Sequence, residues 1–285
     1  MKVYKDFNLK NYNAYQIEAI CKKAFFPENE ADIIELYKNR QDYVLLGSGH
    51  NIIFSKAYYD NDFIIFNGNF NTLKVDKTSN SIEAESGATI LEVSNLAQKY
   101  SLSGAEFFYD IPSSVGGAVV MNAGTKEGET KNILSKVRYL DLVDMQVKEK
   151  HNEDLQLTYR NSVFQKQKDK VILKAWFQLQ VGDAEEIKTI MEASKARRWE
   201  KQPREYPNCG SVYKRPPGRF VGPMLDELGL KGYRVGGAEI SKKHSGFIIN
   251  LGNATGEDIL AIIKHTREQV KATFGVDLEV EQRII

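Results

Sequence analysis

Hydrophobic and polar positions follow a helical period in some parts of the chain and form short apolar runs in others. Residues 27–40 are predicted to form a helix with Asn29 as its N-cap. Its apolar stripe consists of Ile33, Ile34, Leu36 and Tyr37. Further helices are predicted at 90–100, 184–199, 221–228 and 255–274. Asn253 or Thr255 is the expected cap of the last of these helices.

Short apolar runs bounded by turn residues predict the strands. These runs are 43–46, 52–54, 63–66, 72–75, 81–84, 137–142, 146–148, 171–181, 245–250 and 276–285. The alternation in KAWFQLQV and the short strands before it indicate antiparallel pairing. Together with the helices, these strands predict an α+β fold.

Two local features bear on the organisation of the chain. A change of composition at Gly182 and Asp183 marks a boundary before the helix at 184–199. Residues 203–218 hold four of the seven prolines, so this stretch is not expected to form regular secondary structure.

The overall composition excludes several classes of protein. Of the 285 residues, 42% are hydrophobic and 27% charged, and 39 Lys and Arg balance 38 Asp and Glu. This balance argues against nucleic acid or a membrane surface as a partner. Cys21 and Cys209 are too few for a disulfide framework and lack metal-ligand spacing, so no metal is expected. The N-terminus has no apolar signal core, and no apolar run approaches the roughly 20 residues of a membrane span, which predicts a cytoplasmic protein.

Two glycine-rich loops have a composition typical of phosphate binding. The first, GSGHN at 47–51, follows a predicted strand, and α/β units bind phosphates at the carboxyl ends of strands. The second lies within GAEFFYDIPSSVGGAVVMNAG at 104–124. Glycines let a phosphate approach the main chain, and nearby hydroxyls add donors, so the two loops are predicted to clasp one dinucleotide. The alternative for the second loop is a tight turn between strands, and the first loop does not match G-x-G-x-x-G.

Arg160 and Ser211 are the first candidates for chemistry. Arg160, in TYRNS, could bind a substrate carboxylate through its forked guanidinium, or it is a surface or ion-pair residue. Ser211 follows Gly210, which would let a ligand approach, and it precedes Lys214 and Arg215, which could stabilise negative charge. The alternative is a structural serine in a glycine-containing loop.

Other polar residues have simpler interpretations. Glu281 and Arg283 lie two residues apart on a predicted strand, as structural pairs often do. His244 is interpreted as part of a solvated charge run, and Cys209 as inert because nothing places a histidine base beside it. His50 could anchor a flavin covalently, contact a phosphate or shape a turn. The sequence contains no hydrolase elbow, H-E-x-x-H motif or Walker loop. The residues alone therefore indicate a dinucleotide-binding α+β protein.

Five motifs, taken together, indicate a particular protein family. They are LLGSGHNIIFS, GAEFFYDIPSSVGGAVVMNAG, LTYRNSVF, CGSVYKRPPGRFVGPMLDELGLKGYRVGGAEISKKHSGFIINLGNAT and FGVDLEVEQRII. In this order they closely resemble the UDP-N-acetylenolpyruvoylglucosamine reductase (MurB) family, flavoenzymes of peptidoglycan synthesis. The resemblance implies a vanillyl-alcohol-oxidase-type FAD-binding fold in two lobes, 1–68 and 69–183, and a C-terminal substrate-binding lobe, 184–285. Residues 173–195 leave no room for the tyrosine-bearing insertion of the longer family form, so the chain resembles the short type.

The same resemblance implies the reaction. NADPH would reduce non-covalent FAD, and the reduced flavin would then pass a hydride to C3 of UDP-N-acetylglucosamine enolpyruvate, which would give UDP-N-acetylmuramate. Arg160 and Glu281 would hold and polarise the enolpyruvyl group, and Ser211 would protonate C2. A basic cluster near Ser211 would meet the UDP diphosphate.

The family motifs also assign binding residues. The implied cofactor-binding residues are Gly47, Ser48, Gly49, His50, Asn51, Ile52, Ile111, Pro112, Ser114, Gly116, Gly117, Asn122 and Gly124. The implied substrate-binding residues are Tyr159, Lys214, Arg215 and Arg283. The chain departs from the usual motifs at Ser48, His50 and Ser113. Two rival functions are an FAD-dependent alcohol oxidase of the same fold and a non-catalytic flavin-binding relative.

Overall fold

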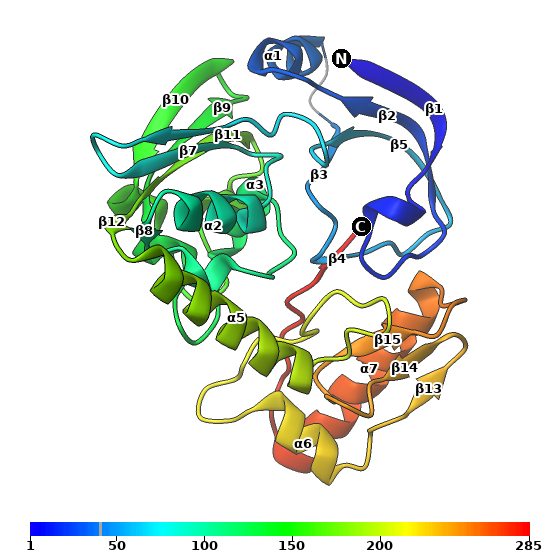
Figure 1. Ribbon diagram of the computed structural model, residues 1–285. Helices are drawn as coiled ribbons and strands as arrows, with labels where there is room; N and C mark the ends of the chain where they lie inside the picture. Colours follow the sequence, from blue (N-terminus) through cyan, green and yellow to red (C-terminus); the bar gives the residue numbers. More distant parts are fainter. Residues whose placement is uncertain (40–41) are drawn as a thin grey trace. The chain divides into compact units, whose positions relative to one another are not determined.

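The computed structural model describes residues 1–39 and 42–285, and Figure 1 follows the chain through its elements. These residues form two compact units. Unit 1 comprises Met1–Lys5, Lys23–Ser48 and Asn61–Ala196. Unit 2 comprises Asp6–Lys22, Gly49–Asp60 and Arg197–Ile285. The boundaries between the units fall within strands β1 (Lys2–Asn8), β2 (Ile20–Phe26) and β5 (Tyr58–Ile65), within helix α5 (Ala184–Lys201), and directly after Ser48.

Unit 1 is built on a five-stranded antiparallel sheet. Its strand order is β10 (Gln146–His151), β9 (Leu134–Asp141), β11 (Lys170–Gln178), β7 (Ser81–Glu85) and β6 (Leu73–Asp76). The antiparallel pairing predicted for 137–142, 146–148 and 171–181 is therefore confirmed. The prediction of one strand over 171–181 was too long, because β11 ends at Gln178 and β12 (Gln180–Val181) pairs instead with β8 (Leu102–Ser103).

Helices α2 (Ile90–Lys99) and α3 (Val115–Met121) share one apolar core with this sheet. Phe108 and Phe177 are fully buried in that core, with ring centroids 5.6 Å apart in an edge-to-face arrangement. A capping box at Thr89 and Glu92 begins α2, since each side chain accepts a hydrogen bond from the other residue's backbone amide.

A second sheet of unit 1 leads into the start of the first glycine-rich loop, Gly47 and Ser48. Strand β3 (Val44–Leu46) runs parallel to the unit 1 part of β5, and the parts of β1 and β2 that belong to unit 1 extend this sheet. Helix α1 (Glu30–Asn39) buries Ile33, Leu36 and Tyr37, as its stripe predicts, whereas Ile34 is only half-buried.

Asn29 caps α1 as predicted, because its side chain accepts from the backbone N–H of Asp32 at 2.9 Å. Arg40, the last residue of the predicted helix, lies outside the described residues. Strands β1 and β2 were not predicted, because their polar and charged residues hide the strand period.

Unit 2 contains a small antiparallel sheet and the longest helix in the described residues. The strands are β13 (Arg234–Val235), β14 (Ala238–Ile240) and β15 (Ile248–Asn250), and α7 (Gly256–Phe274) packs on β13 and β14. Thr255, one of the two expected residues, caps α7 in a capping box with Asp258. The strand predicted at 276–285 is wrong for most of its length: only β16 (Arg283–Ile284) forms, parallel to β4 (Ile52–Ile53).

The remaining elements are short connections. They are η1 (Lys10–Tyr12), η2 (Glu106–Phe108), η3 (Thr130–Asn132), η4 (Asn152–Leu155), α4 (Val163–Lys166) and α6 (Val221–Glu227). Residues 203–218 contain no helix or strand, as their prolines predict. Among the described residues, no helix combines the length and apolarity needed to cross a membrane.

Candidate active site

The second glycine-rich loop begins a helix. Ser114 has extended backbone angles, and its hydroxyl accepts from the N–H of Gly117 at 3.2 Å, so it is the N-cap of α3. Gly116 and Gly117 therefore lie in the first turn of a helix, and the alternative of a turn between two strands is wrong. The first backbone N–H groups of this helix already have partners outside it, since Val115 donates to the carbonyl of Ala88 at 2.7 Å and Gly116 donates to that of Ser86 at 3.1 Å. The donors that remain for an anionic ligand at this helix start are therefore hydroxyls.

The first glycine-rich loop contacts the second within unit 1. The backbone N–H of Ser114 donates to the Ser48 hydroxyl at 3.0 Å. A Cβ placed on Gly47 would lie only 2.5 Å from the Ser114 hydroxyl oxygen. Gly47 and Ser48 therefore lie directly against the start of α3, and the absence of a side chain at position 47 is what allows the approach.

The rest of the first loop belongs to unit 2. Gly49 has a positive φ of 72°, and a Cβ there would lie 2.0 Å from the carbonyl oxygen of Tyr12, so this close backbone approach requires glycine. The Asn51 side chain donates to the carbonyl of Glu281 at 3.2 Å. Ile52 then pairs with Arg283 in the parallel β4 and β16 strands. His50 is half-buried.

Asn122 and Gly124 follow α3 and shape the segment that carries Arg160. Asn122 is fully buried and ends the helix in the left-handed conformation (φ 44°). Its side chain donates to Glu129 and to the carbonyl of Thr158, and it accepts from the N–H of Lys131. Two further predicted cofactor-binding residues precede α3: Ile111 packs against the apolar core, whereas Pro112 is exposed.

Arg160 lies in a strained turn. Its φ of 50° is unusual for a residue with a side chain, and reciprocal backbone hydrogen bonds of 3.1 Å between Thr158 and Asn161 close the turn around it. The guanidinium donates to the carbonyl of Gly124 at 2.9 Å and stacks on the exposed Tyr159 ring, 5.1 Å from its centroid. The charge is thus held by the main chain that follows α3.

Ser211 and Glu281 are brought together in unit 2. Ser211 forms an antiparallel bridge with Phe247, and the next residue, Val212, accepts from the N–H of Glu281 at 2.8 Å. Ser211 is exposed and Glu281 half-buried. Gly210 has a φ of 74° with open space around its Cα, as a ligand-facing turn requires.

Cys209 is confirmed as an inert residue. It is 4% exposed, and its thiol donates to the carbonyl of Ile52 at 3.3 Å. Burial raises the pKa of this thiol to about 12, so it is protonated at neutral pH and is not a nucleophile.

The basic residues beyond Ser211 have distinct surroundings. Lys214 pairs with Glu279 at 2.6 Å, so its charge already has a carboxylate partner. Arg215 is exposed and lies over the ring of Phe220 at 4.8 Å. Arg283 is exposed at the start of β16.

The interpretation of His244 as a solvated charge was wrong. Its ring packs edge-on against Phe247, and Nδ1 accepts from the N–H of Gly246 at 3.1 Å. Burial lowers the pKa of His244, which favours the neutral ring.

Two residues of the site gave no sequence signal. The buried Gln282 lies between the predicted residues Glu281 and Arg283, and it contacts the Ser211 segment and Tyr15. Neither a lone glutamine on a strand nor a lone tyrosine near the N-terminus has a spacing that distinguishes it from a core residue.

Comparison with known proteins first defines the class. Residues 22–148 match the FAD binding domain family, and residues 202–285 match the family described as UDP-N-acetylenolpyruvoylglucosamine reductase, C-terminal domain. The protein is thus an FAD-dependent oxidoreductase with an α+β FAD-binding fold, as predicted.

Similarity over the full length then defines the family. The chain is 39% identical over 280 residues to the UDP-N-acetylenolpyruvoylglucosamine reductase of Francisella tularensis, covering 98% of each chain. It is 40% identical over 287 residues to that of Geobacillus kaustophilus, covering 99% of this chain and 93% of the relative. The crystal structure of the Thermus caldophilus enzyme matches with a TM-score of 0.84 at 28% identity, covering 99% and 98% of the two chains. The chain belongs to the UDP-N-acetylenolpyruvoylglucosamine reductase family.

The loops of unit 1 fit the cofactor of this family. The contacting segments at 47–48 and 114–117 offer the hydroxyls of Ser48 and Ser114 as donors and glycines without Cβ atoms. Such neutral donors bind a diphosphate without adding charge to the protein.

Proposed function

We propose that this protein reduces UDP-N-acetylenolpyruvoylglucosamine to UDP-N-acetylmuramate with NADPH, through non-covalently bound FAD. The reaction would take place in the cytoplasm and supply a precursor of peptidoglycan, and hence serve cell-wall synthesis, cell shape and division. The observation that carries the proposal is the pairing of the Ser211 and Glu281 segments in a chain of this family. This pairing supports a mechanism in which Ser211, as an acid, and the Glu281 carboxylate act on one substrate.

Bound FAD would supply the hydride chemistry, since it would accept a hydride from NADPH and pass it to C3 of the enolpyruvyl group. The loops at 47–52 and 111–124 would hold this cofactor. We assign the diphosphate to the hydroxyls of Ser48 and Ser114, because each accepts a backbone N–H and can donate its own proton next to glycines. Asn122 and Gly124 would act on the cofactor site indirectly, since Asn122 donates to the carbonyl of Thr158 and Gly124 accepts from Arg160.

We assign the substrate carboxylate to Arg160. Main-chain carbonyls and the Tyr159 ring orient its guanidinium, so little side-chain freedom would be lost when a carboxylate binds. A cation fixed in this way stabilises the negative charge that develops next to the carboxylate as C3 is reduced.

Ser211 would complete the reaction by giving its proton to C2, and Glu281 would hold the polarised group. The exposed position of Ser211 beside an open glycine suits a group that meets the substrate directly. Arg215 is the preferred contact for the UDP diphosphate, because its forked guanidinium is exposed four residues after Ser211, with Arg283 as a second cation. In this proposal residues 1–68 and 69–183 serve FAD and residues 184–285 serve the substrate.

Two measurements on the purified protein test the function. FAD should be released into the supernatant by acid precipitation, and under anaerobic conditions NADPH should be consumed beyond one equivalent per flavin only when the enolpyruvyl substrate is added. A protein that stays colourless at high FAD concentration would refute the proposal. Flavin retained in the pellet together with oxygen consumption on an alcohol would favour the oxidase, and bound FAD without turnover would favour the binding relative.

A further inference from the structure

The side-chain amide of Gln282 holds the segment that carries Ser211 through hydrogen bonds to its main chain. Its side-chain nitrogen lies 3.1 Å from the carbonyl oxygen of Cys209 and 3.4 Å from those of Gly210 and Ser211. Since carbonyls only accept hydrogen bonds, the NH₂ group must face them and the amide oxygen must point the other way. Gln282 is 3% exposed, so these bonds form away from solvent.

Tyr15 fixes the other side of the same amide. Its hydroxyl donates to the Gln282 amide oxygen at 2.9 Å, and the tyrosine is 0% exposed. Burial raises the pKa of Tyr15 well above its usual value, so the hydroxyl keeps the proton that it donates. The amide therefore has one hydrogen-bonded orientation.

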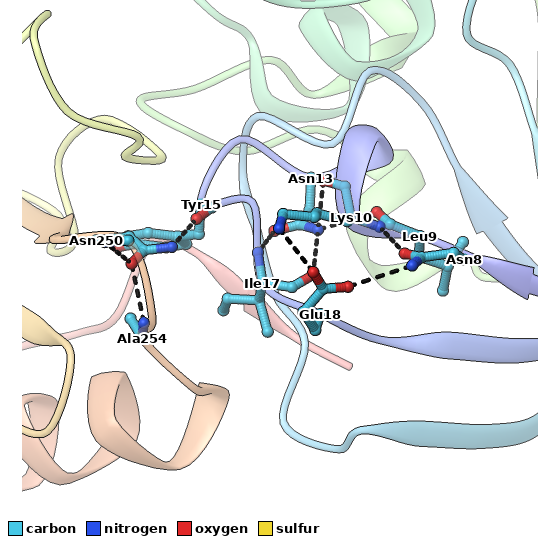
Figure 2. A network of polar contacts seen from close by, with 10 residues as sticks. Asn8, Leu9, Lys10, Asn13, Tyr15, Ile17, Glu18, Asn250 and Ala254 are labelled. Atoms are coloured by element: carbon cyan, nitrogen blue, oxygen red, sulfur yellow. Dashed lines mark hydrogen bonds and ion pairs between the residues drawn. The ribbon is translucent and has the colours of Figure 1, made fainter.

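The loop that carries Tyr15 is itself held in place. Figure 2 shows that the Asn250 side chain donates to the carbonyl of Tyr15, at 2.7 Å, while Asn13 binds main-chain groups on both sides of the loop. The N–H of Ala14 also donates to the carbonyl of Gly49 at 3.0 Å. A rigid loop thus supports the tyrosine, and the tyrosine supports the amide.

We infer that Tyr15 and Gln282 form a buried pair that positions Ser211 against Glu281 for the proton-transfer step. Gln282 directly follows Glu281 in the chain, so one residue ties the proposed acid to the proposed carboxylate. On the N-terminal side of Ser211, Gly210 is in the left-handed region with open space where a Cβ would lie, so hydrogen bonds and not side-chain packing hold this residue. Without the hydrogen bonds from Gln282 the serine hydroxyl would sample a wider range of positions, and misplacement of a catalytic group by about 1 Å can cost about 100-fold in rate. The inference rests on the proposed function, because it takes Ser211 as the acid.

The test compares Gln282→Leu with a matched control. Leucine keeps the approximate volume of the side chain but donates no hydrogen bond. The control, Asn69→Leu, removes an amide in unit 1 that donates to the carbonyls of Pro27 (2.6 Å) and Ile65 (3.0 Å). Stopped-flow absorbance follows flavin reduction by NADPH and then flavin reoxidation by substrate.

Gln282→Leu should slow substrate-driven reoxidation by about 10- to 100-fold. Flavin content and NADPH-driven reduction should stay within about twofold of wild type, as should both rates in Asn69→Leu. Wild-type reoxidation in Gln282→Leu, or an equal loss in Asn69→Leu, would overturn the inference.

Tyr15→Phe provides the milder test, and it carries the argument if Gln282→Leu does not fold. By itself it should slow reoxidation by a smaller factor. Where Gln282→Leu folds, this effect should vanish in the Gln282→Leu background, because the hydroxyl acts only through the amide. Additive effects of the two changes would contradict the pair.

Hydrogen exchange separates this inference from the proposed function. Peptides covering residues 208–212 should exchange faster in Tyr15→Phe and Gln282→Leu than in wild type or Asn69→Leu, whether or not the substrate is correct. If wild-type enzyme is not reoxidised by the enolpyruvyl substrate, the proposed function fails. If exchange in 208–212 is unchanged, the positioning pair fails.

Discussion

Replacing Gly47 by alanine tests the contact between the two glycine-rich loops. The new Cβ would lie 2.5 Å from the Ser114 hydroxyl oxygen, closer than such atoms approach in folded proteins. Ser114 is only 2% exposed, and the Ser48 hydroxyl holds its backbone N–H, so the side chain has little room to yield. We expect the hydroxyl to rotate and the cap of α3 to be lost.

Two opposing effects determine how far Gly47→Ala lowers the free energy of unfolding. Loss of an N-cap costs about 0.5–2 kcal/mol. Gly47 does not have a positive φ, so alanine fits the backbone and offsets about 0.4–1 kcal/mol through the unfolded state. The net loss of unfolding free energy should therefore lie between zero and about 1.6 kcal/mol. FAD affinity should fall further, by about 10- to 100-fold, because a charge-assisted hydrogen bond to the diphosphate is worth about 1.5–3 kcal/mol.

The assay is FAD titration of apoprotein, with denaturant unfolding in parallel. Ser114→Gly removes the atom that clashes, so adding Gly47→Ala to Ser114→Gly should cost almost nothing. Gly222→Ala is the matched control, since its nearest neighbour, the Ser245 hydroxyl, lies 3.7 Å away, and its FAD affinity should not change. Wild-type FAD affinity in Gly47→Ala would show that the contact does not shape the cofactor site.

Three further predictions concern the substrate site and the surface of unit 1. Ser211→Ala should leave flavin reduction by NADPH nearly intact and slow reoxidation by substrate about 10²–10⁴-fold in stopped-flow measurements; equal slowing of both halves would refute its role as the acid. Arg215→Ala should raise KM for the enolpyruvyl substrate, with a loss of binding free energy of about 1.5 to 3 kcal/mol. An unchanged KM would show that another residue contacts the diphosphate. The hydrogen bond from Lys148 lowers the pKa of Asp141 to about 2, so the stability from this carboxylate is present above its unfolded pKa near 4 and is lost as pH falls through about 2. The difference in unfolding free energy between wild type and Lys148→Ala should therefore be largest near neutral pH and shrink toward pH 2; a constant difference would contradict the assignment.

The local sequence determined most of the helices. Thr255 and Asn29 cap α7 and α1 where the pattern predicts, and Ile33, Leu36 and Tyr37 are buried as their spacing requires. These signals are reliable because a cap or an apolar stripe acts between residues three or four positions apart. The same limit explains the errors. Strands β1 and β2 were missed because their residues carry no strong strand period of their own. The strand predicted at 276–285 forms only at β16, where β4, distant in sequence, pairs with it.

The candidate catalytic residues were named from motifs, but their surroundings were decided by tertiary structure. The motifs identified Ser211 and Glu281, whereas the main-chain pairing of their segments follows from the fold of unit 2. The left-handed turn at Arg160, and the carbonyl of Gly124 that holds its guanidinium, likewise depend on how the chain returns past α3. No local pattern encodes such contacts, because each needs a partner from another segment.

The sequence by itself determined the helices with their caps and stripes, the family and the chemical types present at the site. Only the tertiary structure decided which of these groups are held rigidly. Tyr15 and Gln282 are 267 residues apart in the chain and form one buried hydrogen bond. A buried hydrogen bond is specified by the geometry of both partners, and each partner alone is an ordinary core residue.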